Sequence, residues 1–312
     1  MQRYEKSLKT KKILILSLLI LVLTSGCAKV LKGEDKKAIT TQDGRTLYSN
    51  ILCKPQDEES IKLYQENGVD LDSLVDCNKL KATTGGYEGL WESVFVKPLA
   101  ALMMWISKYV NSTILAMVLL TLAIRLILYP VTQKTAAQSE MIKQAQPEID
   151  KLEKKYEGKT DQDSMMKKST ELSMIYKKYN INPASSCLFS FIQIPLLFAF
   201  LEAINRLPAL YEEKVLTMKM GTTPWIGISK GNYVYLLIVL ILAVVTFFSF
   251  KFNGQDQAGM QQEQMKTMTI TMSLMIIFMS FMMPAALGVY WIVSSGFTII
   301  QNLLVKRRKK NG

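Results

Sequence analysis

Five long apolar runs constrain this chain more than any other feature of its sequence. They cover residues 113–131, 187–204, 233–252, 267–283 and 285–305. Each approaches the roughly 20 residues that a helix needs to cross the hydrocarbon core of a bilayer. Pro284 separates the last two runs and favours a tight turn there over one overlong helix. The runs therefore predict an all-α polytopic membrane protein with five transmembrane helices.

The amino terminus has the pattern of an exported lipoprotein. Basic residues precede the apolar stretch from Ile13 to Leu23, which is too short to span a bilayer but typical of a signal-peptide core. The following Thr24-Ser25-Gly26-Cys27 resembles a bacterial lipobox, which implies a signal peptide over residues 1–26 and lipidation (palmitate) on Cys27. The alternative is an uncleaved signal anchor in which Cys27 is an incidental thiol. The intact mass of the mature protein would separate the two.

Residues 27–93 would then form an extracellular, lipid-anchored linker or small subdomain. This segment is rich in Lys, Asp, Glu and Gly and has poor apolar periodicity, so we expect it to be loosely structured. Cys53 and Cys77 both lie in it, in a compartment where disulfides persist. Their spacing alone does not establish a disulfide between them.

The basic carboxyl end fixes the predicted orientation. The cluster from Lys306 to Lys310 follows the last run and should stay cytoplasmic. Five crossings from an extracellular amino terminus lead to the same result. Two further elements complete the prediction. They are an outer interfacial helix within 94–110 and a cytoplasmic helical hairpin within 132–182, whose role could be merely connecting or recruiting.

Arg125 is the leading functional candidate because it lies inside the first run. An arginine at the centre of a spanning helix costs roughly 2.5–3.5 kcal/mol on insertion scales, so such residues usually face protein or water. The alternative is a fixed ion pair. The only acid in the five runs, however, is Glu202, which lies near the opposite, outer end of its helix. A functional role is the better interpretation.

Polar residues at helical spacing could surround this arginine. Thr121 precedes Arg125 by one turn, and two further polar groups consist of Tyr290, Ser294 and Thr298 and of Ser190 and Gln193. If these faces converge, they enclose a partly hydrated groove. Singly, each residue is more often a hydrogen-bonding contact between helices.

The fourth run carries a stripe of methionines whose flexible side chains suit varied apolar partners: Met265, Met268, Met272, Met275, Met279 and Met282. Plain helix packing would explain this stripe equally simply. Histidine is absent, which excludes Ser-His-Asp hydrolysis and His-ligated metal sites. We expect no enzyme activity, no metal and no cofactor.

Several motifs resemble those of the YidC insertases, the relatives of the Oxa and Albino proteins, in their lipoprotein-type Gram-positive form. They are Leu120 to Pro130, Gln146-Pro147-Glu148-Ile149, Ile181-Asn182-Pro183, Ile192-Gln193-Ile194-Pro195 and Gly288 to Ser294. The resemblance covers residues 94–310, the expected insertase domain. It implies five helices around a hydrophilic groove that holds Arg125, with Thr121 and Trp291 at substrate-facing positions. The polar faces described above would add Gln193, Tyr290 and Ser294 to this groove.

The resemblance also implies a function and partners. A YidC-type protein facilitates insertion and folding of nascent membrane proteins in the cell membrane, without nucleotide hydrolysis. The ribosome and the Sec translocon are further candidate partners, and no sequence-specific nucleic acid is expected. Two other classes stay open. A small-solute transporter or channel could also use a buried arginine, whereas an intramembrane enzyme is disfavoured by the lack of His and Asp in the runs.

Overall fold

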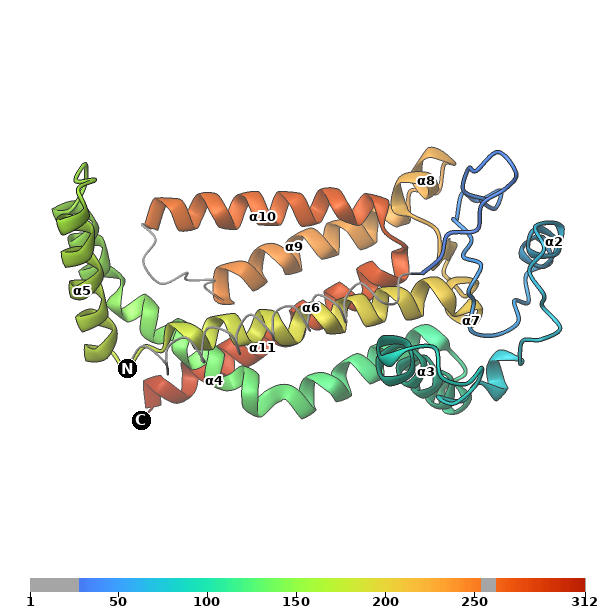
Figure 1. Ribbon diagram of the computed structural model, residues 1–312, viewed down its shortest axis with the longest axis horizontal. Helices are drawn as coiled ribbons and strands as arrows, with labels where there is room; N and C mark the ends of the chain where they lie inside the picture. Colours follow the sequence, from blue (N-terminus) through green and yellow to red (C-terminus); the bar gives the residue numbers. More distant parts are fainter. Residues whose placement is uncertain (1–27, 254–261, 312) are drawn as a thin grey trace, which may run out of the picture. The chain divides into compact units, whose positions relative to one another are not determined.

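The computed structural model describes residues 28–253 and 262–311, and only the backbone of Thr135, Ser139, 183–193, 252–253, 262–266, Met268 and 308–311. The signal peptide and Cys27 lie outside these residues. The described chain is mainly helical (Figure 1). Its helices are α2 (Glu58–Glu66), η1 (Cys77–Lys79), η2 (Glu92–Val96), α3 (Lys97–Val110), α4 (Thr113–Lys155), α5 (Gln162–Lys178), α6 (Pro183–Arg206), α7 (Pro208–Tyr211), α8 (Pro224–Ser229), α9 (Tyr235–Asn253), α10 (Gln262–Met282) and α11 (Ala285–Asn311), and its strands are β1 (Lys214–Val215) and β2 (Met218–Lys219).

The chain divides into two compact units. The outer unit comprises the described part of Met1–Leu120 together with Pro195–Asn232 and Pro284–Leu287. The groove unit comprises Thr121–Ile194, Tyr233–Met283 and Gly288–Gly312. We use these two names below as labels taken from the sequence prediction, and they stand for these residues alone.

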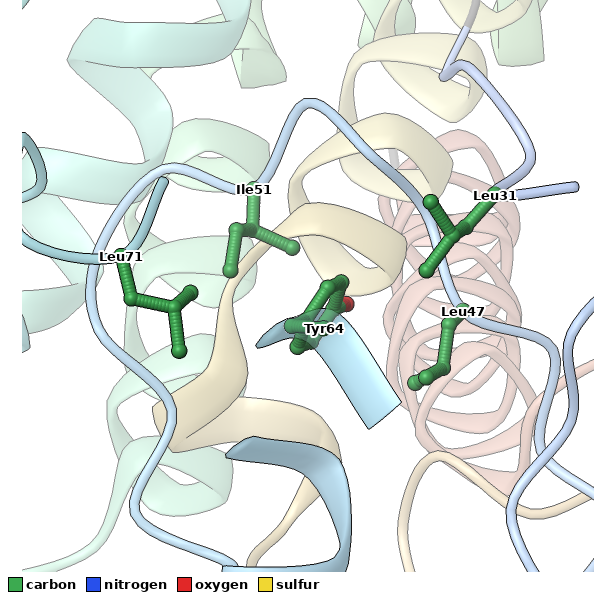
Figure 2. Packing of buried hydrophobic residues seen from close by; sticks show 5 residues of the cluster. All are labelled: Leu31, Leu47, Ile51, Tyr64 and Leu71. Carbon is green, nitrogen blue, oxygen red and sulfur yellow. The ribbon is translucent and has the colours of Figure 1, made fainter. Parts of the chain in front are cut away.

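The predicted linker has a core of its own within the outer unit. Figure 2 shows Tyr64 in the middle of a buried cluster with Leu31, Leu47, Ile51 and Leu71. Isolated antiparallel bridges order the chain before α2, and Cys53 and Cys77 form a disulfide. The expectation of loose structure is therefore wrong, and the alternative of a small subdomain describes this segment. Its apolar residues come mostly from bridges and loops, which leave no regular period in the sequence.

Contacts with later segments stabilise this subdomain. The Leu52 amide donates to the Arg206 carbonyl at 2.8 Å, and the Gln56 amide donates to a Glu212 carboxylate oxygen at 2.9 Å. Arg45 stacks over the Tyr211 ring, with its guanidinium carbon 4.0 Å from the ring centroid. The outer unit thus joins stretches far apart in the sequence.

Three helices among the described residues have the length and composition to cross a membrane. They are Glu92–Val110, Thr113–Lys155 and Ala285–Arg307, each with an apolar 18-residue stretch, whose mean hydropathies are 1.2, 2.3 and 1.3. Tyr235–Lys251 and Thr269–Met282 are shorter apolar helices. Glu92–Val110 contains the segment that the sequence placed at the outer interface. It also meets the criteria for a span because η2 extends the helix back to Glu92.

Two apolar helices and a turn occur in the groove unit where the sequence indicates them. The apolar helices α9 and α10 pack side by side (Figure 1). Helix α10 ends at Met282 and α11 begins at Ala285, so the chain breaks at Pro284 as its sequence indicates.

The first span does not end where its apolar run ends. Helix α4 continues through Pro130 and Pro147 to Lys155, so one helix carries both the span and the first arm of the predicted hairpin. Helix α5 packs back against this arm in the antiparallel sense. Lys178 pairs with Glu148, and Lys155 pairs with Glu171. Ile142, Ala145, Ile149 and Ile181 form the small core between the arms.

Candidate functional site

Arg125 lies on α4 inside the groove unit and is almost covered. Its residue exposure is 5%, and its Nη2 donates to the hydroxyl of Ser294 on α11. The sequence predicted a partly hydrated groove around this guanidinium. In the structure the guanidinium is almost covered by protein, with a hydroxyl of α11 as one of its partners.

Helices α4 and α11 run parallel with a constant offset. Arg125 bonds to Ser294, and seven residues later Thr132 accepts a hydrogen bond from Gln301 at 2.7 Å. Both pairs are 169 residues apart. Because the offset is the same, the two helices must point in the same direction. Tyr129 and Phe297, with ring centroids 6.5 Å apart in an edge arrangement, pack between the two polar pairs.

The polar stripe on α11 is longer than expected. Tyr290, Ser294 and Thr298 are buried, as the four-residue spacing indicates, and Gln301 continues the stripe one turn further. Thr121, Arg125 and Thr132 form the matching buried stripe on α4. We call these two stripes the polar seam. Sequence reasoning missed Gln301 and Thr132, although their helical spacing from Ser294 and Arg125 was a usable signal.

Trp291 connects α11 to a third helix. Its indole Nε1 donates to the hydroxyl of Thr246 on α9 at 3.2 Å, and Thr246 is buried. Thr246 was not singled out from the sequence because it is a lone threonine in a mostly apolar stretch. The indole therefore has a fixed hydrogen-bond partner at the side of the seam.

The other predicted site residues have different outcomes. Gln193 and Ser190 belong to α6, but their side chains lie outside the described residues. The same holds for Met265 and Met268 of the methionine stripe. Of its remaining members, Met272 is half-buried, whereas Met275, Met279 and Met282 are 49%, 40% and 62% exposed and lie on the outside of the groove unit.

Glu202 belongs to a separate ion cluster in the outer unit. Arg206 forms a bidentate pair with Glu92, and its Nη1 lies 3.6 Å from Glu202. The indole of Trp91 donates to the other Glu202 oxygen at 2.9 Å. The single acid of the predicted spans is thus committed to Arg206 and Trp91. Among the described residues, no group of His, Cys, Asp and Glu side chains has the arrangement of a metal site.

The comparison with known families matches this architecture. Residues 105–312 match the family described as the 60Kd inner membrane protein. Membrane protein insertase YidC 1 of Streptococcus pyogenes serotype M6 is 34% identical over 232 residues, which cover 74% of this chain and 79% of that protein. The chain belongs to the YidC family.

Other YidC relatives agree with this assignment. Membrane protein insertase YidC 2 of Bacillus anthracis is 35% identical over 70% of this chain and 82% of its own length. Membrane protein insertase MisCA of Bacillus subtilis is 32% identical over 75% of this chain and 86% of its own length. The family match begins at residue 105, so it includes the polar seam and leaves out the subdomain around Tyr64. With its apolar helices, this YidC protein is a membrane protein.

Proposed function

We propose that this protein is a membrane protein insertase that uses the polar seam to admit hydrophilic segments of nascent membrane proteins. The observation that carries the proposal is a buried guanidinium, Arg125, held by a hydroxyl between two apolar helices. A charge in such a place is costly to maintain and is usually functional. The insertase names of the relatives support the same conclusion.

The seam can act by exchanging partners. The bond from Arg125 to Ser294 joins a charge to a neutral hydroxyl. A client carboxylate that replaced the hydroxyl would form a charge–charge bond, which is stronger in a site shielded from water. A short acidic or polar client segment would then move only part of the membrane thickness unaided. Gln301 and Thr132 would hold α4 and α11 in register while the exchange takes place.

The apolar part of the client would supply the driving force. Exposed methionines of α10 offer flexible thioether contacts to varied apolar helices. Partition of the client helix into lipid then completes the transfer through the hydrophobic effect. The process requires neither covalent chemistry nor nucleotide hydrolysis. The five spans would enclose a hydrophilic groove bounded by the seam, with the α4–α5 hairpin as a cytoplasmic element of recruiting or connecting role.

The parallel direction of α4 and α11 supports the proposed topology. The first and fifth spans of a five-span protein cross in the same direction. With Cys27 lipidated outside, the basic end from Lys306 onward would then lie in the cytoplasm. Nascent membrane proteins are the proposed partners, and the ribosome and the Sec translocon could deliver them.

Insertion by the purified protein in proteoliposomes tests the function. Several labelled clients with short acidic exported segments are added, and protease protection measures how much is inserted. We expect insertion by the parent protein and by Arg125→Lys, and a large loss with Arg125→Ala. Retained insertion by Arg125→Ala for every client would refute the mechanism. No insertion by the parent, or saturable flux of small anions through it, would instead favour a transporter.

A further inference from the structure

A second basic site lies in the groove unit, just beyond the last pair of the polar seam, Thr132 and Gln301. A cavity of about 280 Å³ opens between α4, α9 and α11. Its lining includes Lys143 of α4, Lys251 of α9 and Lys306 of α11, with Glu140 as the one acid. Ligand pockets in proteins begin at roughly 300 Å³, so the cavity suits a headgroup-sized ligand. Three lysines from three helices make it attractive to an anion.

The apolar helix segments end at this cavity. Lys251 follows the apolar part of α9, and Lys306 follows the apolar part of α11. Lysines at the end of a span extend their ammonium groups toward the bilayer surface. The cavity is therefore at the level where phospholipid headgroups lie, whichever face of the membrane that is.

Exposed apolar side chains flank the lysines on the membrane side. Phe247 precedes Lys251 by one turn and is 44% exposed. Leu303 lines the cavity itself and is 40% exposed. A free phosphate ion would make no use of these side chains, whereas an acyl chain would pack against them. A lysine cavity bordered by exposed apolar groups is the expected arrangement for a lipid with an anionic head.

The lysines of this cavity differ from those of the hairpin. Lys155, Lys168 and Lys178 are paired with Glu171, Glu153 and Glu148 between α4 and α5. Those pairs stabilise the hairpin internally. The lysines at the cavity come together from three separate helices around a space that Glu140 also lines.

We propose that the cavity lined by Lys143, Lys251 and Lys306 binds the phosphate headgroup of an anionic phospholipid. The lipid would connect α9 to α4 and α11 at the membrane surface where these helices end. The site does not involve the polar seam and does not depend on the insertase activity.

Retention of phospholipid by the full-length protein tests this site. The protein is placed in nanodiscs of phosphatidylcholine and phosphatidylglycerol, released into mild detergent, and its bound lipids are counted by native mass spectrometry. We expect phosphatidylglycerol to be enriched over its share in the nanodisc. Each single change, Lys143→Gln, Lys251→Gln or Lys306→Gln, should reduce the enrichment about fivefold, the effect of one lysine at a membrane surface. The triple variant should retain both lipids in the bulk ratio.

Matched variants separate the site from a general charge effect. Lys154→Gln, Lys159→Gln and Lys177→Gln together remove the same charge from the exposed hairpin surface and should leave the enrichment unchanged. The triple Lys→Arg variant of the cavity should keep it, which guards against a folding defect. Equal enrichment in the triple Lys→Gln variant would overturn the proposal.

Two added measurements distinguish other sources of phosphate. Soluble glycerol phosphate is titrated into the detergent-solubilised protein, and binding as tight as that of the lipid would overturn the lipid assignment. Ribosome binding by the triple Lys→Gln variant is measured by co-sedimentation. Lost ribosome binding with unchanged lipid enrichment would assign the cavity to RNA phosphates and would likewise overturn the proposal.

Discussion

Ser294 has a definable role beside Arg125 because its hydroxyl accepts a hydrogen bond from the guanidinium. If client carboxylates take the place of this hydroxyl, Ser294→Ala should insert clients at close to the parent rate. Its thermal stability should fall, since a hydrogen bond to a charged group contributes about 1.5–3 kcal/mol. Proteoliposome insertion and unfolding in detergent would be measured side by side. Loss of insertion equal to that of Arg125→Ala would show that Ser294 positions the guanidinium. It would contradict the exchange of the Ser294 hydroxyl for a client carboxylate.

Glu92 provides a test in the outer unit. It forms the bidentate partner of Arg206, and both residues are buried, at 5% and 2% exposure. Removing one member of a buried pair leaves an uncompensated charge and typically costs about 3–5 kcal/mol. Glu202, 3.6 Å from Arg206, keeps part of the pairing. We therefore expect Glu92→Gln to lower the free energy of unfolding by about 3 kcal/mol, the lower end of that range.

The control for Glu92→Gln is Asp163→Asn. Asp163 pairs with Lys167 on the surface of α5, where both side chains are more than half exposed. Exposed pairs contribute at most about 1 kcal/mol. Chemical denaturation should therefore show a clearly larger loss of unfolding free energy for Glu92→Gln than for Asp163→Asn. Equal losses would mean that the Arg206 cluster contributes little to folding.

Sequence spacing predicted part of the polar seam and missed the rest. The four-residue steps from Tyr290 to Thr298 correctly indicated one face of α11. Thr246 could not be found in this way, because a lone threonine has no period and gains meaning only from its partner. Gln301 was overlooked, although it follows Thr298 by one turn on the same face. The enclosure of Arg125 was also unpredictable, since it depends on how closely α11 packs on α4.

At the scale of elements, the disulfide between Cys53 and Cys77 closes a loop within the subdomain. Closing a loop of this size restricts the unfolded chain and contributes about 3 kcal/mol. The Cys53→Ser, Cys77→Ser double variant should thus unfold its outer unit at a lower temperature than the parent. Reductant should lower the parent to the same temperature and leave the double variant unchanged. A reductant effect on the double variant would place the sensitivity elsewhere.

Helix boundaries were predicted where one residue type determines them and missed where packing does. Pro284 ends α10 at the expected place, because proline cannot continue the hydrogen bonds of the preceding helix. Pro130 has no such effect, and α4 passes through it. Helix α4 extends for several turns on each side of Pro130, so the backbone hydrogen bond lost at the proline does not end the helix.

At the scale of the whole molecule, stretches distant in the sequence are held together by charge in the outer unit. Lys219 lies 3.2 Å from Asp43 and 3.6 Å from Asp57, and the Thr222 hydroxyl donates to Asp43 at 3.2 Å. None of these contacts has a signal in the sequence, because the partners are more than 150 residues apart. Part of the seam within the family region was predictable from spacing and motifs, whereas this network was not.

The pH dependence of the outer unit follows from this network. Burial alone would raise the pKa of Asp43, but the Thr41 hydroxyl and Lys219 outweigh it, and the pKa lies below the ordinary 3.8. For Asp57, burial is likewise outweighed by bonds from Ser60 and by Lys219, and its pKa is also lowered. A carboxylate with a lowered folded pKa stabilises the fold above its unfolded value. That stabilisation is lost as the pH falls through the folded pKa.

We therefore expect the thermal stability of the outer unit to lose the contribution of these carboxylates as the pH drops from 3.8 downward. Asp43→Asn should be less stable than the parent at neutral pH, and the two should converge in acid. Asp35→Asn, which removes an exposed surface carboxylate, should instead follow the parent curve. Tryptophan fluorescence during heating at a series of pH values would measure this. An Asp43→Asn curve parallel to that of the parent would show that Lys219 does not hold the distant stretches together.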